Sequence, residues 1–204
     1  MSSPARPTKA DVVTDFRRSQ ILDAARQSFV RSGVEGTTVD DIARTAGVAK
    51  GTVYLYYRSK DDILRQLLTE DLAALFDQTM PGLSAADPVD VKLRGFLRAM
   101  IAFFDQRRDF IDQCQFEMGA EARRKVVQKL ETVFRAQIDA WRTALDAAAA
   151  AGDLGPIDTR AAAFAIVGLA QGLAKQRLRG WNDEPVDAAV ESGTTLLWKG
   201  LAAR

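Results

Sequence analysis

Apolar residues recur every three or four positions along most of the chain, the spacing that places them on one face of an α-helix. The first such pattern, with Ile21, Ala25 and Phe29, predicts a helix that begins near Thr14 and ends at Gly33. Later patterns predict helices over residues 61–79, 88–106, 108–118, 121–150, 158–180 and 185–202. The pattern therefore predicts an all-α protein.

Two short helices joined by a tight turn are predicted between residues 36 and 64. Thr38 with Asp41 forms a capping-box pattern, which predicts a helix from Val39 to about Thr45. Gly47 can adopt the left-handed conformation that ends this helix, and a second helix follows over about residues 50–57. A helix, a glycine turn and a helix form the arrangement that many proteins use to read DNA.

The second short helix has an inner face with Val53 and Tyr57 and an outer face that suits a major groove. Its outer positions are Lys50, Gly51, Tyr54, Leu55 and Arg58. Lys50 could donate to guanine, while Thr52 and Leu55 could contact thymine methyl groups. The candidate phosphate donors are Tyr54, Tyr56 and Lys60. An ordinary helical hairpin with surface tyrosines is the alternative interpretation.

Charge supports an anionic partner for the N-terminal part. Residues 1–60 carry 10 Lys or Arg against 6 Asp or Glu, whereas residues 61–204 carry 18 against 21. The first part is therefore basic and the remainder mildly acidic.

Missing residue types exclude several kinds of chemistry. The chain has no His, which excludes Ser-His-Asp triads and His metal sites, and its one Cys excludes an internal disulfide. We therefore expect no catalytic residues, no metal and no cofactor. The N-terminus lacks a signal-peptide core, and the longest apolar stretch, residues 161–170, is half a membrane span. We expect a cytoplasmic protein with no membrane partner.

Three segments, Gly36–Ala43, Ala46–Tyr57 and Lys60–Leu64, resemble the TetR family of bacterial transcriptional regulators. The resemblance implies a three-helix helix-turn-helix DNA-binding domain followed by a six-helix domain for ligand binding and dimerisation. The expected boundaries are a flexible arm over residues 1–13, the DNA-binding domain over 14–59 and the second domain over 60–204. Ala49 departs from the family, in which a polar residue is common there, so the second short helix lacks a side-chain cap.

The resemblance also assigns roles on the expected DNA-binding face. Lys50, Gly51, Thr52 and Leu55 would face bases; Tyr54, Tyr56 and Lys60 would hold phosphates, and Thr38 would lie near the backbone. Basic residues in and after the arm either add contacts to DNA or belong to a solvated tail: Arg6, Lys9, Arg17 and Arg18.

In the second domain, the resemblance implies a cavity for a small hydrophobic or amphipathic effector. The expected ligand-binding residues are Phe104, Gln113, Cys114, Glu117, Trp141, Phe164 and Gln171. Phe110, Phe116 and Val167 are further candidates for the cavity wall, and Gln137 and Arg142 are further polar candidates. A plain packed core is the alternative for the apolar residues, and solvated surface or an internal hydrogen bond is the alternative for the polar ones.

A dimer interface is expected on the last two helices. Small residues at helical spacing would let a second helix approach closely, and they are Ala161, Ala165, Gly168 and Gly172. The resemblance implies a four-helix interface completed by Val190, Gly193, Leu197 and Leu201. Tight packing inside one chain is the alternative.

These expectations combine into a homodimeric transcriptional repressor that binds a near-palindromic double-stranded DNA operator and is released by an unknown small-molecule effector. The alternatives are a DNA-binding activator or architectural binder without effector, a helical enzyme using carboxylates such as Glu117 with Asp112, and an interaction module that no longer binds DNA.

Overall fold

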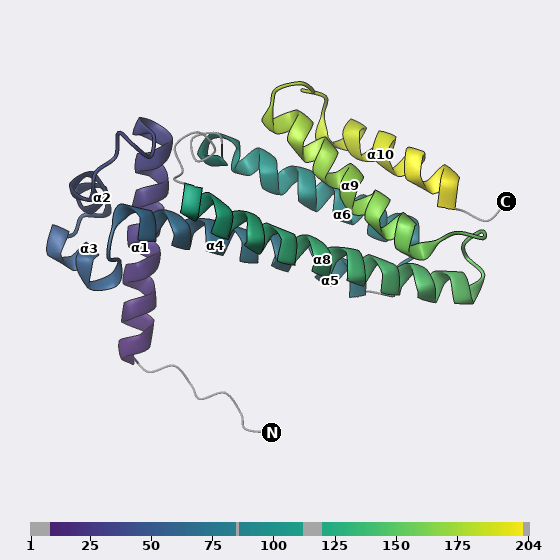
Figure 1. Cartoon of the computed structure of the whole chain (residues 1–204), viewed down its shortest axis with the longest axis horizontal. Coiled ribbons are helices and arrows are strands. Elements are labelled where there is room, and N and C mark those ends of the chain that lie inside the picture. Colours follow the sequence, from purple (N-terminus) through teal and green to yellow (C-terminus); the bar gives the residue numbers. More distant parts are fainter. Residues whose placement is uncertain (1–8, 85, 112–119, 202–204) are drawn as a thin grey trace. The chain divides into compact units, whose positions relative to one another are not determined.

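The computed structural model describes residues 9–84, 86–111 and 120–201, and over these residues the expected all-α fold is confirmed (Figure 1). The described residues form helices joined by turns and contain no β-strand. The chain divides into two compact units. The head unit comprises residues 1–70 and 109–126, and the body unit comprises residues 71–108 and 127–204.

The head unit contains α1 (Lys9–Ser32), α2 (Val39–Ala46), α3 (Lys50–Tyr56) and the first half of α4 (Lys60–Thr79). Helix α1 begins five residues before the expected Thr14. Residues 9–13 contain neither Gly nor Pro, so no residue in this stretch breaks the helix. The helix ends where predicted, at Gly33, which has a φ of 73°.

The head unit has its own hydrophobic core, in which α2 and α3 lie on the same side of α1 (Figure 1). Ile21, Ala25 and Phe29 of α1 are fully buried, as their spacing predicts. Ile42 and Val53 fill the space between the short helices and α1. Phe110 also belongs to this core and stacks on Phe29 with ring centroids 6.5 Å apart.

The body unit contains the second half of α4, α5 (Pro81–Ser84), α6 (Val89–Gln106), most of α8 (Ala120–Ala151), α9 (Thr159–Leu178) and α10 (Val186–Leu201). Helix α6 packs against both α9 and α10 (Figure 1). Residues Phe96, Met100, Trp141, Leu145 and Val167 lie in the shared core. None of the described helices is both long and apolar enough to cross a membrane.

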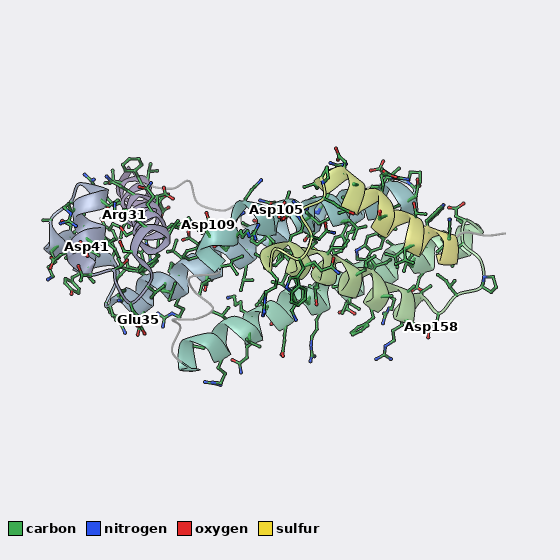
Figure 2. The ribbon with its side chains drawn as sticks, turned by 90° about the horizontal axis from the view of Figure 1, so that it is seen from above. Arg31, Glu35, Asp41, Asp105, Asp109 and Asp158 are labelled. Carbon is green, nitrogen blue, oxygen red and sulfur yellow. The ribbon has the colours of Figure 1, made fainter. Side chains whose placement is uncertain are left out.

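An ion pair fixes the end of α9 to α6. The Arg177 side chain donates from Nε to both carboxylate oxygens of Asp105, at 2.8 and 2.9 Å, and from Nη2 to one of them at 2.7 Å. Arg177 Nη1 also donates to the carbonyl of Glu184, just before α10. Asp105 is labelled in Figure 2, on α6 of the body unit. The Arg177 side chain therefore connects α9 to α6 and to the segment before α10.

Candidate nucleic-acid interface

The first short helix begins at the capping box that the sequence predicts. The backbone N–H of Asp41 donates to Thr38 Oγ1 at 3.2 Å, and the backbone N–H of Thr38 donates to Asp41 Oδ2 at 3.0 Å. Hydrogen bonds from Thr38, with the nearby Arg44 guanidinium, lower the pKa of Asp41. Asp41 is labelled on α2 in Figure 2. These paired bonds fix the direction in which α2 leaves the preceding loop.

The turn between α2 and α3 depends on the left-handed backbone of Gly47, which has a φ of 66°. Its N–H donates to carbonyls of the last turn of α2, and the N–H of Val48 reaches the carbonyl of Ala43 at 3.0 Å. A residue with a Cβ would be strained in this conformation. The tight turn therefore brings α3 directly onto α2.

Helix α3 buries the two residues expected on its inner face. Val53 and Tyr57 are almost fully enclosed, and the Tyr57 hydroxyl donates to the carbonyl of Arg18 at 3.4 Å. Burial raises the pKa of Tyr57, so its hydroxyl stays protonated as a donor. Ala49 provides no side-chain cap, as predicted.

The opposite face of α3 is open to solvent. Leu55 is 81% exposed and Tyr54 is 49% exposed, so both side chains are open to a partner. Gly51 is exposed, and a Cβ built there meets no atom within 4 Å. Thr52 and Tyr56 are half-buried at the edges of this face. The sequence-predicted candidates Lys50, Gly51, Tyr54 and Leu55 thus share one exposed helical surface.

Lys50 is already paired on this surface. Its Nζ donates to Asp40 Oδ2 of α2 at 2.7 Å, and this hydrogen bond together with the carboxylate charge raises the pKa of Lys50. Asp40 was not among the expected site residues. Its place in the first turn of α2, ten positions before Lys50, is the only signal for it in the sequence.

The ammonium group of Lys60 binds backbone carbonyls of the head unit instead of being free to bind a phosphate. Its Nζ donates to the backbone carbonyls of Val34 at 2.5 Å, Thr37 at 2.8 Å and Glu35 at 3.3 Å. An ammonium group has three N–H donors, so these carbonyls can occupy all of them. The expected phosphate contact is corrected accordingly: in this structure Lys60 closes the loop between α1 and α2.

The basic residues near the start of α1 have local partners. Arg17 Nη1 donates to Gln20 Oε1 at 2.7 Å, and the Arg18 guanidinium lies 6.0 Å from the ring centre of Tyr57. Arg6 and the side chain of Lys9 lie outside the described residues.

In the body unit, the described ligand-binding candidates differ in burial. Trp141 is fully buried against Phe96, with ring centroids 5.5 Å apart. Phe104 and Gln171 are half-buried. Gln113, Cys114 and Glu117 lie outside the described residues.

Phe164, which was expected in a cavity wall, is 66% exposed rather than enclosed. The inner face of α9 is formed instead by Ala163, Ile166, Val167, Ala170 and Ala174. Phe164 lies on the outside of α9, in a surface groove of about 750 Å³ between α8 and α9. Asp158, labelled in Figure 2, caps the start of α9 at one end of this groove. Phe110 also departs from its expected wall position, since it belongs to the head-unit core.

Two buried polar atoms on α8 have no hydrogen-bond partner among the described residues. They are Gln137 Oε1 and Trp141 Nε1, one helical turn apart. The amide nitrogen of Gln137 does have partners, since it donates to Thr79 Oγ1 at 2.9 Å and lies 3.8 Å from Met100 Sδ. Thr194 Oγ1 of α10 is also buried without a partner. A buried polar atom without a partner costs free energy, which makes these atoms unusual in a packed core.

The small residues of α9 lie on its outer face, as the sequence predicts. Ala161, Ala165, Gly168 and Gly172 are all exposed. Because they are exposed, these residues are accessible to a second copy of the chain, as the predicted dimer requires.

The face of α10 that was expected to meet a second copy packs against this chain's own core instead. Val190 is fully buried in this chain's own core, and Gly193 faces Leu97 and Leu173. Leu197 is half-buried against the same core, and the side chain of Leu201 lies outside the described residues. The correction follows from helical periodicity: Val190, Gly193 and Leu197 share the inner face, so the outer face carries Ala188, Ser192, Thr195 and Leu196.

Comparisons with known proteins agree with this geometry. The family model described as "Bacterial regulatory proteins, tetR family" matches residues 21–67, which contain the second half of α1, all of α2 and α3, and the start of α4. The uncharacterised HTH-type transcriptional regulator YhgD of Bacillus subtilis is 26% identical over 196 residues, covering 92% of this chain and 97% of that protein.

Two further proteins carry more specific names. The HTH-type transcriptional repressor KstR2 of Mycolicibacterium smegmatis is 29% identical over 125 residues, covering 56% of this chain and 60% of that protein. The solved structure of the flavonoid-responsive regulator FrrA is 25% identical and superposes with a TM-score of 0.66, covering 93% of this chain and 99% of that structure.

Proposed function

Because this chain belongs to the TetR family of bacterial regulatory proteins, we propose that it is a ligand-responsive transcriptional repressor that binds a near-palindromic operator as a homodimer. The chain is a transcriptional regulator and not an enzyme. The proposal adds the operator symmetry, the direction of regulation and the response to a ligand.

The exposed face of α3 is the observation that carries the proposal. Tyr54 and Leu55 are held outward because Val53 and Tyr57 on the opposite side are locked into the head-unit core. A rigid helix with an open outer face fits a major groove, which admits one α-helix. Lys50, Gly51, Thr52 and Leu55 would meet base edges, while Tyr54, Tyr56 and the start of α2 at Thr38 would contact phosphates and set the register.

The buried polar atoms of α8 support an effector site in the body unit. Trp141 Nε1 offers a hydrogen-bond donor and Gln137 Oε1 an acceptor, and both are enclosed by apolar side chains. A small, uncharged molecule with a hydroxyl or amide group would satisfy both atoms and bury its remaining surface against aromatic rings. Repression would end because the effector binds the state that does not fit DNA more tightly than the state that does.

The outer faces of α9 and α10 support the homodimer. Small residues on α9 allow a second copy to approach closely, and the exposed side chains of Phe164 and Leu196 offer apolar anchors beside them. A dimer presents two copies of α3, which must meet successive major grooves about 34–36 Å apart.

We also propose the domain boundaries that the sequence predicts, with the DNA-binding domain beginning after residue 13 and ending at residue 59.

Fluorescence anisotropy on a duplex from upstream of the chain's own gene tests the proposed function. A scrambled duplex is the control, and both are titrated at two salt concentrations. We expect tight binding that prefers the upstream duplex at the higher salt. Lys50→Ala should weaken this binding about tenfold, because it removes a base contact, and Tyr54→Phe should weaken it on both duplexes, because it removes a phosphate donor.

Equal and steeply salt-dependent binding to both duplexes would contradict the proposal, because it reports attraction to phosphates alone. Unchanged affinity after both substitutions would show that α3 is not the reading helix. Specific binding would also provide the assay in which candidate effectors are detected by release of the duplex.

A further inference from the structure

The ion pair between Asp40 and Lys50 connects α2 and α3 beside the exposed face of α3. Lys50 Nζ lies 2.7 Å from Asp40 Oδ2, and the two side chains are 51% and 61% exposed. The adjacent Gly51 adds no side chain that would screen the pair. Both charged groups are therefore available to a partner that approaches α3.

The ion pair itself contributes little to stability, although Asp40 lies in the first turn of α2, where an acid is favourable. An ion pair so exposed adds little to the stability of the fold, because water screens the charges and both side chains lose freedom. DNA carries a dense line of negative charge, so a carboxylate on a DNA-binding face opposes association with most sequences. Lys50 offsets part of this repulsion, and a hydrogen-bond donor on the DNA facing Asp40 would offset more of it.

One base pair supplies the complementary pattern. In the major groove, guanine presents the acceptors N7 and O6, and its cytosine partner presents the N4 amino donor beside them. An ammonium group only donates and a carboxylate only accepts, so a Lys–Asp pair matches these groups. At an A·T pair the amino group of adenine replaces the O6 acceptor, and it would face the ammonium. A phosphate offers no donor to Asp40 at all.

We propose that Asp40 and Lys50 together read one G·C base pair in each operator half-site. Lys50 donates to guanine O6 and N7, while Asp40 accepts from cytosine N4 and restrains the ammonium from reaching phosphates. Asp40 is thus a specificity-determining residue that lowers affinity for other sequences. This inference rests on the proposed function, since it requires that α3 enters the major groove.

A set of single-pair operator variants tests the inference. The operator is first selected from a randomised duplex pool by the wild-type full-length protein. Each G·C pair of the half-site is then replaced in turn by A·T, and anisotropy gives the dissociation constant of every duplex for wild type, Asp40→Ala, Lys50→Ala and the double variant. Asp61→Ala, which removes an exposed acid from α4 in the same head unit, is the matched control.

We expect wild type to lose about tenfold in affinity at one G·C position, the discrimination that a good base contact provides. Asp40→Ala should lose most of this discrimination at the same position and bind a scrambled duplex several-fold more tightly. The double variant should discriminate no worse than Lys50→Ala, because the two residues act as one unit. Asp40→Asn, which keeps the shape of the side chain, is the second variant, and it should also lose the preference for G·C.

The outcomes separate the two proposals. Failure of the wild type to enrich any sequence would contradict the proposed function. A specific wild type whose G·C discrimination survives in both Asp40 variants would overturn the inference and leave the proposed function standing. The inference also fails if Asp61→Ala loosens specificity as much as Asp40→Ala does, because the effect would then be one of net charge.

Discussion

Two lysines of the head unit show how the partner of a side chain decides its role. Lys50 shares its ammonium with one exposed carboxylate, whereas Lys60 donates to three backbone carbonyls of the loop before α2. Composition treats the two residues alike, and the sequence predicts that both reach DNA. Backbone carbonyls leave no mark in a sequence pattern, so the place of Lys60 could not be predicted.

Lys60→Met tests this difference. The substitution leaves three carbonyls without their charged donor, so we expect the free energy of unfolding in urea to fall by about 2 kcal/mol. The slope of log affinity for DNA against log salt should stay the same, because no phosphate contact is lost. A slope reduced by about 0.9 with unchanged stability would show that Lys60 holds a phosphate.

At the scale of helices, local signals were enough for most of the head unit. The capping box at Thr38 and the left-handed Gly47 are confirmed because both act through hydrogen bonds with near neighbours. The orientation of α10 was not predictable in the same way. Val190 and Leu197 on one side and Leu196 on the other are all apolar, so only packing against α6 and α9 selects the inner face.

Gly193 measures how closely α10 approaches its neighbours. A Cβ at this position would lie 3.1 Å from a methyl group of Leu97 and 3.2 Å from one of Leu173. We expect Gly193→Val to lower the free energy of unfolding by about 1–3 kcal/mol, because the enlarged side chain must push α10 away from α6 and α9. Thermal and urea unfolding would measure this change.

The control for Gly193→Val is Gly95→Ala. Gly95 is an exposed position of α6, and a Cβ there meets no atom within 4 Å. Alanine should raise the free energy of unfolding by about 0.5–1 kcal/mol through helix propensity alone. A Gly193→Val protein as stable as wild type would show that α10 does not pack in this way.

At the scale of the whole molecule, the outer faces of α9 and α10 decide whether two copies can associate. Leu196 is 68% exposed, and the stripe of small residues on α9 is open as well. Exposed apolar groups that gather on adjoining helices indicate a protein interface. The small residues of α9 predicted from the sequence lie on this surface, whereas Val190 and Gly193 of α10 lie on the inner face of their helix.

Leu196→Arg should separate the dimer. A charged side chain in an apolar interface lacks a partner, so we expect a monomer by size-exclusion chromatography with light scattering. Affinity for a two-half-site operator should fall steeply, since the second head no longer binds as part of the same molecule.

Trp181→Ser is the matched control for Leu196→Arg. Trp181 is also a large exposed side chain, but it lies in the turn after α9 and not on either helix, with the Arg179 guanidinium 5.9 Å from its ring centre. This variant should remain a dimer. A dimeric Leu196→Arg protein would place the interface elsewhere.

The stacking of Phe110 on Phe29 limits how the head can be exchanged between related regulators. Phe110 comes 40 residues after the first stretch of the head unit ends, yet it closes the core around α1, and the Arg26 guanidinium lies 4.7 Å from its ring centre. A chimera that takes only residues 1–70 would leave Phe29 facing an unrelated side chain. Grafting a new DNA specificity onto another regulator therefore requires two separate pieces of this chain, or a recipient that already carries an aromatic ring at the matching position.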